Sequence, residues 1–342
     1  MMVWGHIARF LKAGKACALV TVVSVAGSAP REAGARMVVL GDGRFHGTIG
    51  GGELEFQVIL WAQKALKNGA HGIDVRTFSL GPDLGQCCGG RTEIALEVLT
   101  TDQLANATML AEAESKFDLV RTQARMEGTS VGVREIQKLD QKSAMAPFVL
   151  EDNLLQECFG EAKRPLYLFG AGHVGKALIL ALAPHPFEVI WVDSRADVFP
   201  SAFPPNVTAV QADEPGSVLA NAPEDAFVMV MTQSHPLDEA ICAAALARDC
   251  FDYVGVIGSK TKRARFKKRL SERGLGDDQV AKLVCPIGNP SIRSKAPSAI
   301  AAGVVVEMLV AHELHANGHK EQVSKRSHDE GPVSQAHERV QT

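Results

Sequence analysis

The feature that most constrains the fold is a glycine pattern that directly follows a short apolar run. Residues 166–169 read Leu-Tyr-Leu-Phe, and glycines follow at positions 170, 172 and 175. A helical pattern comes next, and a second apolar run ends at Asp193, 23 residues after the first glycine. A strand, this glycine spacing, a helix and an acid, in this order, are typical of a Rossmann dinucleotide-binding unit. We therefore expect Gly170, Gly172, Gly175 and Asp193 to contact a cofactor.

Strand-like and helix-like segments alternate over the rest of this half of the chain. Apolar runs lie at residues 188–192, 227–231 and 253–257, and helical patterns lie at 176–183, 237–247, 260–270 and 298–314. Strands separated by helices imply a parallel sheet with right-handed crossovers. The expected fold class is therefore α/β, with a Rossmann-like, doubly wound parallel sheet over residues 165–315.

The first 120 residues predict a smaller α+β domain. A β-branched run from Ala16 indicates a buried strand, residues 41–43 indicate a hairpin, and residues 53–66 have the apolar spacing of a helix. Residues 121–164 are weakly patterned, and we interpret them as a linker and irregular structure. Residues 316–342 are polar and rich in histidine, so we expect a disordered tail there.

Two adjacent cysteines followed by two glycines form the most unusual motif of this first domain. They are Cys87, Cys88, Gly89 and Gly90. Most free cysteines are small hydrophobic residues, but nothing about a turn requires two thiols. Thiolate sulfur is a soft ligand for a metal, and glycines let a bound group approach the backbone closely. We interpret this loop as a cofactor-binding site, with Cys88 or Cys87 as the metal ligand.

Three further glycines, Gly50, Gly51 and Gly52, stand directly before the expected helix at residues 53–66. Free amides at the start of a helix bind anions, and the helix dipole favours this. We interpret these glycines as a cradle for a phosphate or an oxyanion, although a tight strand-to-helix turn would explain them equally well. Acidic residues in the first turn of the helix count against an additional anion there.

The segment from Lys260 to Arg269 is basic at seven of its ten positions. Such a run is usually the solvated face of a helix. This one begins just after an expected parallel strand, at the sheet edge where doubly wound folds bind ligands. We therefore expect Lys260 and Arg263 near the ligand and the other charges on a basic surface. His235 also follows a strand, and it is either an acid–base group or a helix cap.

Composition excludes several classes of function. The formal net charge of −3 argues against nucleic acid as the main partner. The seven cysteines show no C-x-x-C spacing, which argues against a zinc site. An odd number of cysteines without a leader sequence indicates reduced thiols, so we expect a cytoplasmic protein. The longest apolar run, residues 299–306, is far shorter than the ~20 residues that span a bilayer, so no membrane is expected. No catalytic set of side chains stands out.

These motifs together resemble those of the XdhC/CoxI family, the XdhC branch in particular. The resemblance covers about residues 15–310. It rests on GSAPREAGARMVV (27–39), HGTIGGGELE (46–55), LGQCCGG (84–90), LFGAGHVG (168–175), YVGVIGSKTKRARFKKRL (253–270) and CPIG with IRSKAPSAIA (285–301).

The resemblance implies a non-catalytic accessory protein of molybdenum hydroxylases. Such a protein binds the molybdenum cofactor (molybdopterin), holds it for sulfuration by a cysteine desulfurase, and inserts it into apo-xanthine dehydrogenase. Carriers of this family are often homodimers. Glu53, Gln233 and Ser294 depart from the family pattern, in which two histidines and a glycine are usual at these positions.

Two other hypotheses stay open at this point. The glycine turn and Asp193 also fit an NAD(P)-dependent oxidoreductase, with NAD(P) or another nucleotide bound at the turn. The third hypothesis is a scaffold that binds the dehydrogenase and no cofactor.

Overall fold

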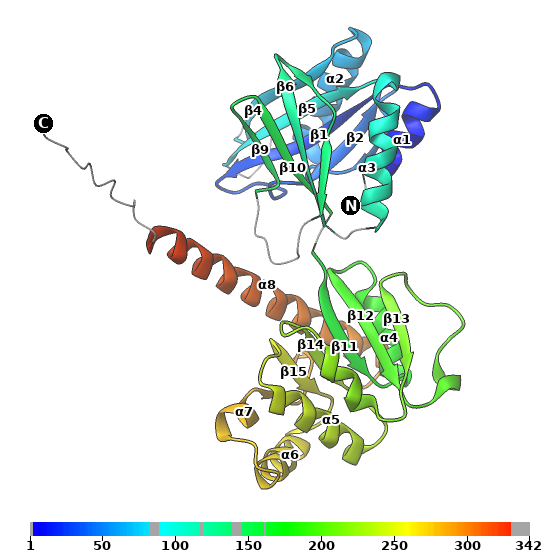
Figure 1. The fold of residues 1–342 in the computed structure, drawn as a ribbon, viewed down its shortest axis with the longest axis vertical. Helices are drawn as coiled ribbons and strands as arrows, with labels where there is room; N and C mark the ends of the chain where they lie inside the picture. The colour runs from blue at the N-terminus through cyan, green and yellow to red at the C-terminus, as the bar shows by residue number, and fades with distance from the viewer. Residues whose placement is uncertain (1–2, 82–88, 117–118, 139–145, 161, 330–342) are drawn as a thin grey trace, which may run out of the picture. The chain divides into compact units, whose positions relative to one another are not determined.

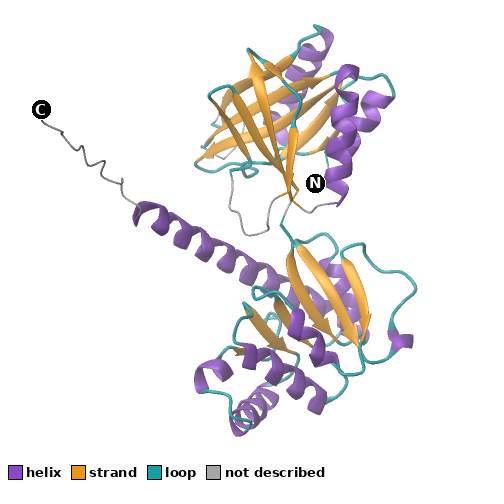
Figure 2. Ribbon diagram, viewed as in Figure 1, coloured by secondary structure: helices purple, strands orange, loops and turns teal. Residues whose placement is uncertain are grey.

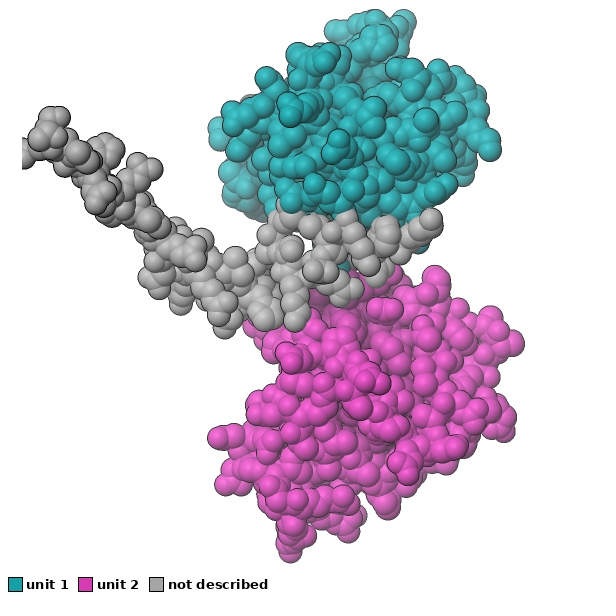
Figure 3. All heavy atoms as spheres, viewed as in Figure 1, with its two compact units in different colours: residues 1–162 teal, residues 163–342 magenta. Residues whose placement is uncertain are grey.

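The computed structural model describes residues 3–81, 89–116, 119–138, 146–160 and 162–329. The chain divides into two compact units, unit 1 (residues 1–162) and unit 2 (residues 163–342), which Figure 3 shows in different colours.

The first sheet of unit 1 is antiparallel and has five strands. These are β1 (Cys17–Ala26), β2 (Arg36–Leu40), β3 (Phe45–Gly47), β4 (Gly72–Ser79) and β5 (Arg91–Leu99), flanked by the helices α1 (Trp4–Lys12), α2 (Gly52–Lys67) and α3 (Leu104–Lys116). The strand order is β3-β2-β1-β5-β4 (Figures 1 and 2). Val20 and Val22 of β1 pack with α2, whereas Cys17 and Leu19 pack with α1 and α3. Both faces of β1 are therefore buried, which explains its continuous apolar run.

A second sheet completes unit 1 and corrects the expectation that residues 121–164 are linker and irregular structure. It contains β6 (Leu119–Glu127), β7 (Ser130–Val131), β8 (Glu135–Lys138), β9 (Phe148–Glu151) and β10 (Leu154–Gly160). The order is β7-β6-β10-β9, and β8 also pairs with β6.

The sequence signal of this second sheet is weak because some of its inward-facing side chains are polar or charged. Thr122 and Glu157 are both buried. The guanidinium of Arg134, also buried, lies 2.7 Å from Glu157 and 2.5 Å from Glu97 of β5. An ion-paired cluster thus lies where apolar alternation would otherwise mark the strands.

Unit 2 is a parallel six-stranded sheet with helices on both faces, as the sequence predicts. Its elements are β11 (Arg164–Phe169), α4 (His173–Leu182), β12 (Phe187–Asp193), β13 (Val207–Gln211), β14 (Phe227–Val230), α5 (His235–Arg248), β15 (Tyr253–Val256), α6 (Lys260–Glu272), α7 (Asp277–Ala281), β16 (Leu283–Val284) and α8 (Pro297–Asp329). Short 3-10 helices lie at Thr101–Gln103 of unit 1 and at Ala196–Val198 and Pro215–Asn221 of unit 2.

The strand order of unit 2 is β13-β12-β11-β14-β15-β16, with every neighbouring pair parallel (Figure 1). One face packs on α4 and α8, and the other packs on α5 and α6. The order of the strands reverses between β11 and β14. Ligands of doubly wound folds bind at the carboxyl ends of the strands beside such a reversal.

The helix α8 extends beyond the domain end that the sequence predicts at residue 315. It is helical to Asp329, which corrects the expected tail over residues 316–329, while residues 330–342 lie outside the described part of the chain. Its segment Pro297–His315 is long and apolar enough to cross a membrane by length and composition alone. Ala301, Val304 and Met308 of this segment nevertheless lie in the core of unit 2, as expected of a core helix in a globular domain.

Candidate functional site

Three loops that carry sequence motifs leave the first sheet of unit 1 at one edge, the one formed by the ends of the strands where β1 and β4 finish and β5 begins. Ala26, the last residue of β1, pairs with Arg91, the first residue of β5. Arg91 also pairs with Ser79, the last residue of β4. Antiparallel pairing therefore places the end of β1 and the loop between β4 and β5 together. The described segments that meet at this edge are residues 27–35, residues 48–51, and the two ends of the connection between β4 and β5, residues 80–81 and 89–90.

Close backbone contact between these loops explains two of the glycines that the sequence marks as ligand contacts. A Cβ atom at Gly90 would lie 2.3 Å from the carbonyl oxygen of Ser28. A Cβ atom at Gly50 would lie 2.3 Å from the Cβ atom of Pro30. Any side chain would clash at both positions, so these glycines let the loop at residues 27–35 pack against its two neighbours.

Two other glycines of this edge have open space beside them. Among the described residues, apart from the chain neighbours, a Cβ atom at Gly51 or at Gly89 would meet no atom within 4 Å. Gly51 has a φ of +72° and Gly52, the first residue of α2, has a φ of +65°, a region that favours glycine. The backbone at Gly51 and Gly89 is therefore accessible to a bound group.

The amides in front of α2 are already hydrogen bonded to a carboxylate of the protein. Oε2 of Glu55 accepts hydrogen bonds from the Thr48 hydroxyl at 2.6 Å, the Ile49 amide at 3.1 Å and the Gly51 amide at 3.2 Å. The Gly50 amide donates to the Thr48 hydroxyl at 3.0 Å. A glutamate thus occupies the position where the sequence predicts a phosphate or an oxyanion. Glu53, which departs from the family pattern, is exposed and contributes nothing to this arrangement.

Cys87 and Cys88 lie outside the described residues, but both ends of their loop are described. Leu80 is buried, and its amide donates to the carbonyl oxygen of Gly90 at 2.8 Å. The loop therefore begins and ends at the edge described above. Among the described residues, no group of three or more His, Cys, Asp or Glu side chains could hold a metal ion.

Burial makes several of the described cysteines poor ligands. Burial raises the pKa of Cys17 to about 12, and it also raises the pKa of Cys158, Cys242 and Cys285. A thiol with a raised pKa supplies little thiolate at neutral pH. These four cysteines are therefore structural residues.

The three glycines of the Rossmann turn have different roles in unit 2. Gly170 has a φ of +112°, and a Cβ atom there would lie 2.4 Å from the Met231 carbonyl oxygen. A Cβ atom at Gly175 would lie 2.2 Å from the Gly170 carbonyl oxygen, so this glycine lets α4 pack closely against β11. Gly172, the N-cap of α4, is exposed with no atom within 4 Å of a Cβ position. Only Gly172 leaves space for a ligand at the helix start.

Asp193 ends β12, where a Rossmann acid normally contacts a ribose, but both of its oxygens have protein partners. Oδ2 accepts from the Ala171 amide at 2.8 Å and from Nη2 of Arg195 at 3.0 Å. Oδ1 accepts from Nε of Arg195 at 3.0 Å. Burial raises the pKa of this carboxyl, but the hydrogen bonds from Arg195 and Ala171 outweigh burial and hold the pKa below its usual range. Arg195 also donates to Gln233 at 2.9 Å.

A buried lysine lies at the carboxyl edge of the sheet, two residues after the Lys260 that the sequence predicts near the ligand. Lys260, the first residue of α6, is exposed, whereas Lys262 is buried. Nζ of Lys262 donates to Oδ2 of Asp238 at 2.6 Å and to the Ile257 carbonyl oxygen at 2.8 Å. Oδ1 of Asp238 accepts from the Thr232 amide and hydroxyl at 2.9 and 2.6 Å. This ion pair fixes the loops after β14 and β15.

The helical spacing of this segment could have identified Lys262 as a buried residue from the sequence. Lys262, Phe266 and Leu270 recur at every fourth residue and form the buried face of α6. Arg263, which the sequence also places near the ligand, is exposed. His235 is exposed as the first residue of α5, and the side chain of Ser234 caps that helix instead.

Comparison with known proteins gives a consistent family. The profile of the XdhC Rossmann domain matches residues 166–308, and the profile of the XdhC and CoxI family matches residues 10–79. The chain is 27% identical over 313 residues to a protein of Bacillus subtilis (strain 168) described as a probable subunit of xanthine dehydrogenase, covering 85% of this chain and 92% of that protein. It is 25% identical over 301 residues to the uncharacterized protein YqeB of Escherichia coli (strain K12), which covers 85% of this chain but spans only 43% of the length of YqeB.

A solved structure shares the fold. The crystal structure of a xanthine dehydrogenase from Bacillus halodurans superposes with a TM-score of 0.68 and 22% identity, covering 91% of this chain and 96% of that one. The two profiles match in succession and together cover more than half of the sequence. The chain belongs to the XdhC and CoxI family.

Proposed function

We propose that this chain acts in the maturation of xanthine dehydrogenase as a chaperone of the molybdenum cofactor. In this proposal it binds the cofactor, holds it for sulfuration by a cysteine desulfurase and inserts it into the apo-enzyme. Membership of the XdhC and CoxI family and the name of the Bacillus subtilis relative support the link to that enzyme. The chain would then be a cytoplasmic accessory protein and a homodimer rather than a catalyst.

The observation that carries this proposal is the meeting of three motif loops at one edge of the first sheet of unit 1. The loop that contains Cys87 and Cys88 begins and ends there, beside residues 27–35 and 48–51. Glycines whose backbone lies open to a bound group, Gly51 and Gly89, belong to two of these loops. Such a convergence of loops is what a binding site requires, and a purely structural turn does not.

The residues of this edge fit the metal part of the cofactor better than its phosphate. Molybdenum is bound through soft sulfur, which a thiolate of Cys87 or Cys88 would supply. A phosphate in front of α2 would have to displace the carboxylate of Glu55 from three hydrogen bonds. The exposed helix start at Gly172 is a second place open to a phosphate.

We expect Cys88→Ser to keep the fold and lose most of the bound cofactor. The serine hydroxyl is nearly isosteric with a thiol, but it is a harder donor and stays protonated at neutral pH. Cys88 is ranked above Cys87 because it directly precedes the two glycines. The measurement is the fluorescence of oxidised pterin released from the purified protein, for the wild type, both single variants and the double variant.

Cys250→Ser is the matched control because Cys250 is a half-buried cysteine of unit 2. It should keep the wild-type amount of pterin. Full loading of a folded Cys87→Ser/Cys88→Ser variant would remove thiol ligation from the proposal. A wild-type protein that carries no pterin, even after incubation with the cofactor, would favour a scaffold that binds only the dehydrogenase.

A nucleotide-dependent oxidoreductase is the second candidate, and the strand order and glycine turn of unit 2 favour it. The pairing of Asp193 with Ala171 and Arg195 argues against it, because a ribose would have to displace these partners. Calorimetric titration with NAD(P)H separates the two functions. Micromolar binding together with turnover would replace the chaperone by an oxidoreductase.

A further inference from the structure

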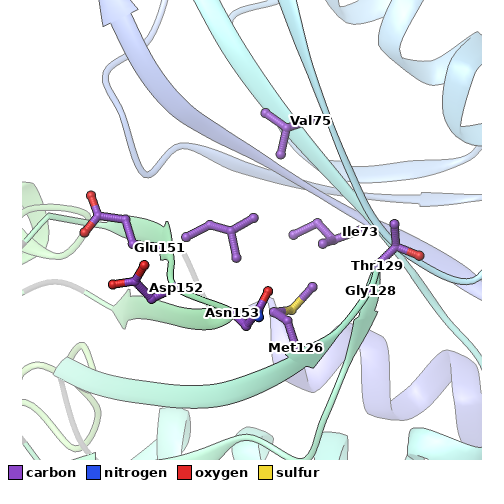
Figure 4. Close-up of a pocket in the computed structure, with 9 residues that line it drawn as sticks. Ile73, Val75, Met126, Gly128, Thr129, Glu151, Asp152 and Asn153 are labelled. Carbon is purple, nitrogen blue, oxygen red and sulfur yellow. The ribbon is translucent and has the colours of Figure 1, made fainter.

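A cavity of about 340 Å³ lies between the two sheets of unit 1 (Figure 4). It is lined by β4 of the first sheet and, in the second sheet, by the end of β6 with the turn after it and by the turn between β9 and β10. Its apolar side chains are Ile73, Val75, Met126 and Leu150, and its acidic residues are Glu151 and Asp152. The buried residues Ile73 and Met126 form its floor, whereas Val75 and Leu150 are 41% and 38% exposed. The cavity is therefore open to solvent and large enough for one or two apolar side chains.

The strand β4 beside this cavity has one unpaired edge. It is the last strand of the first sheet, and β5 is its only partner strand in the described part of the chain. The amide of Ile73 points away from β5, because it donates to the Thr129 carbonyl oxygen at 2.8 Å. Backbone groups alternate in direction along a strand, so those of Val75 and Thr77 point to the same side as those of Ile73. No described strand pairs with them.

The acidic residues stand at the rim of the cavity on a tight turn. Asp152 and Asn153 have φ values of +49° and +60°, as in a two-residue hairpin, and they join β9 to β10. Glu151 and Asp152 are exposed, and neither side chain has an ion-pair partner among the described residues. The rim therefore presents negative charge to anything that enters the cavity.

We propose that β4 binds an extended peptide segment of a partner protein as an additional strand. Backbone groups of the segment pair with those of Val75 and Thr77, which would complete the unpaired edge. An apolar side chain of the segment enters the cavity between Val75 and Leu150. A lysine or arginine beside it pairs with Glu151 or Asp152. An unpaired edge, an apolar cavity and an acidic rim together select an extended segment that is both apolar and basic.

The test is an unbiased selection from displayed linear peptides against the full-length protein. We expect the selected peptides to alternate apolar and polar residues and to contain lysine or arginine. Affinities of the selected peptides are then measured by fluorescence anisotropy. N-methylation of the peptide amides that face β4 should abolish binding, because these amides pair with the edge of the strand. N-methylation of the amides that face away from β4 should have little effect.

Two variants locate the binding to this edge. Thr77→Pro removes an N–H that no described residue uses, and Glu151→Lys reverses a rim charge. Each should weaken binding about threefold to tenfold, since Thr77→Pro removes one main-chain hydrogen bond and Glu151→Lys turns an attraction at an exposed site into a repulsion. Glu112→Lys is the matched control, because Glu112 is an exposed acid on α3 that does not line the cavity, and it should bind as the wild type does.

Three results would overturn the proposal. The first is a selection that yields no binder. The second is a set of binders that Thr77→Pro and Glu151→Lys leave unaffected. The third is a concentration-dependent dimer that Thr77→Pro abolishes, since the occupant of the edge would then be β4 of a second copy.

Discussion

Single buried or half-buried carboxylates hold the loops around both candidate sites. Glu55 accepts three hydrogen bonds in front of α2, and Asp238 accepts from Thr232 and Lys262 at the carboxyl edge of unit 2. Removing such a carboxylate leaves its donors without this acceptor inside the protein, and removing one donor leaves the carboxylate with fewer hydrogen bonds. That loss costs more than the interaction itself contributes, because the remaining groups stay partly desolvated.

We expect Glu55→Ala to destabilise unit 1 by about 1–3 kcal/mol, since the Ile49 and Gly51 amides lose their acceptor. The free energy of unfolding in urea measures this. Glu53→Ala is the control: this neighbouring acid is exposed and, among the described residues, bound only to Gln57, so its loss should change stability by less than about 0.5 kcal/mol. Equal effects of the two substitutions would contradict a structural role for Glu55.

Lys262→Met should destabilise unit 2 by about 3–5 kcal/mol, because it leaves the carboxylate of Asp238 buried with only its neutral donors. The double variant Lys262→Met/Asp238→Asn should recover part of this loss, since no charge is then buried without a counter-charge. Lys260→Met, on the exposed first residue of α6, should have almost no effect. A double variant no more stable than Lys262→Met alone would show that the two residues are not coupled.

At the scale of elements, α8 is fixed to the sheet of unit 2 by a polar cluster as well as by its apolar face. Nε of Arg164, the first residue of β11, donates to Nδ1 of His312 at 3.2 Å. Arg164 also pairs with Asp252 at 2.5 Å, and His315 of α8 lies 3.5 Å from the same carboxylate. Because His312 accepts from a cation, it must be neutral at Nδ1 for this contact.

Acidification should therefore destabilise unit 2 through His312. Burial and then the charge of Arg164 lower the pKa of this histidine, although Glu313 opposes them. As the pH falls, His312 takes up a proton in the unfolded chain at a higher pH than in the folded chain. Its contribution to stability is therefore fully present above the ordinary histidine pKa of about 6.5 and is lost as the pH drops below it. Urea unfolding at about pH 7.5 and about pH 5.5 measures this change.

The difference in the pH dependence of stability between the wild type and His312→Gln separates the effect of His312 from that of the nearby His315. Glutamine still offers an oxygen to Arg164 but does not titrate, so the variant should lose part of the pH dependence. Identical pH profiles for His312→Gln and the wild type would contradict the assignment.

Elements with a regular apolar period could be predicted from the sequence, and elements with polar interior positions could not. The Rossmann turn was predictable because Gly170, Gly175 and Asp193 are each required by backbone geometry. The second sheet of unit 1 was not, because Glu157 and Arg134 replace apolar residues in its interior. The same holds for single residues: three glycines predict an anion cradle, but only the folded structure reveals a carboxylate in it.

At the scale of the whole molecule, the two units have separate cores. Each described core cluster draws its residues from one unit alone: three lie within residues 1–162 and two within residues 163–342. Units of this size bury enough apolar surface to fold independently. The candidate cysteine loop belongs to unit 1 and the Rossmann turn to unit 2, so the two can be separated by experiment.

We expect fragments 1–162 and 163–342, expressed separately, each to unfold in a single cooperative transition, because neither shares its core with the other. If thiolates of Cys87 and Cys88 hold the cofactor, fragment 1–162 should retain bound pterin and fragment 163–342 should not. The controls are fragment 1–162 with both cysteines changed to serine, and an equimolar mixture of the two fragments. Pterin bound by the full chain or the mixture, but by neither folded fragment alone, would show that thiol ligation in unit 1 is insufficient and that binding requires residues of both units.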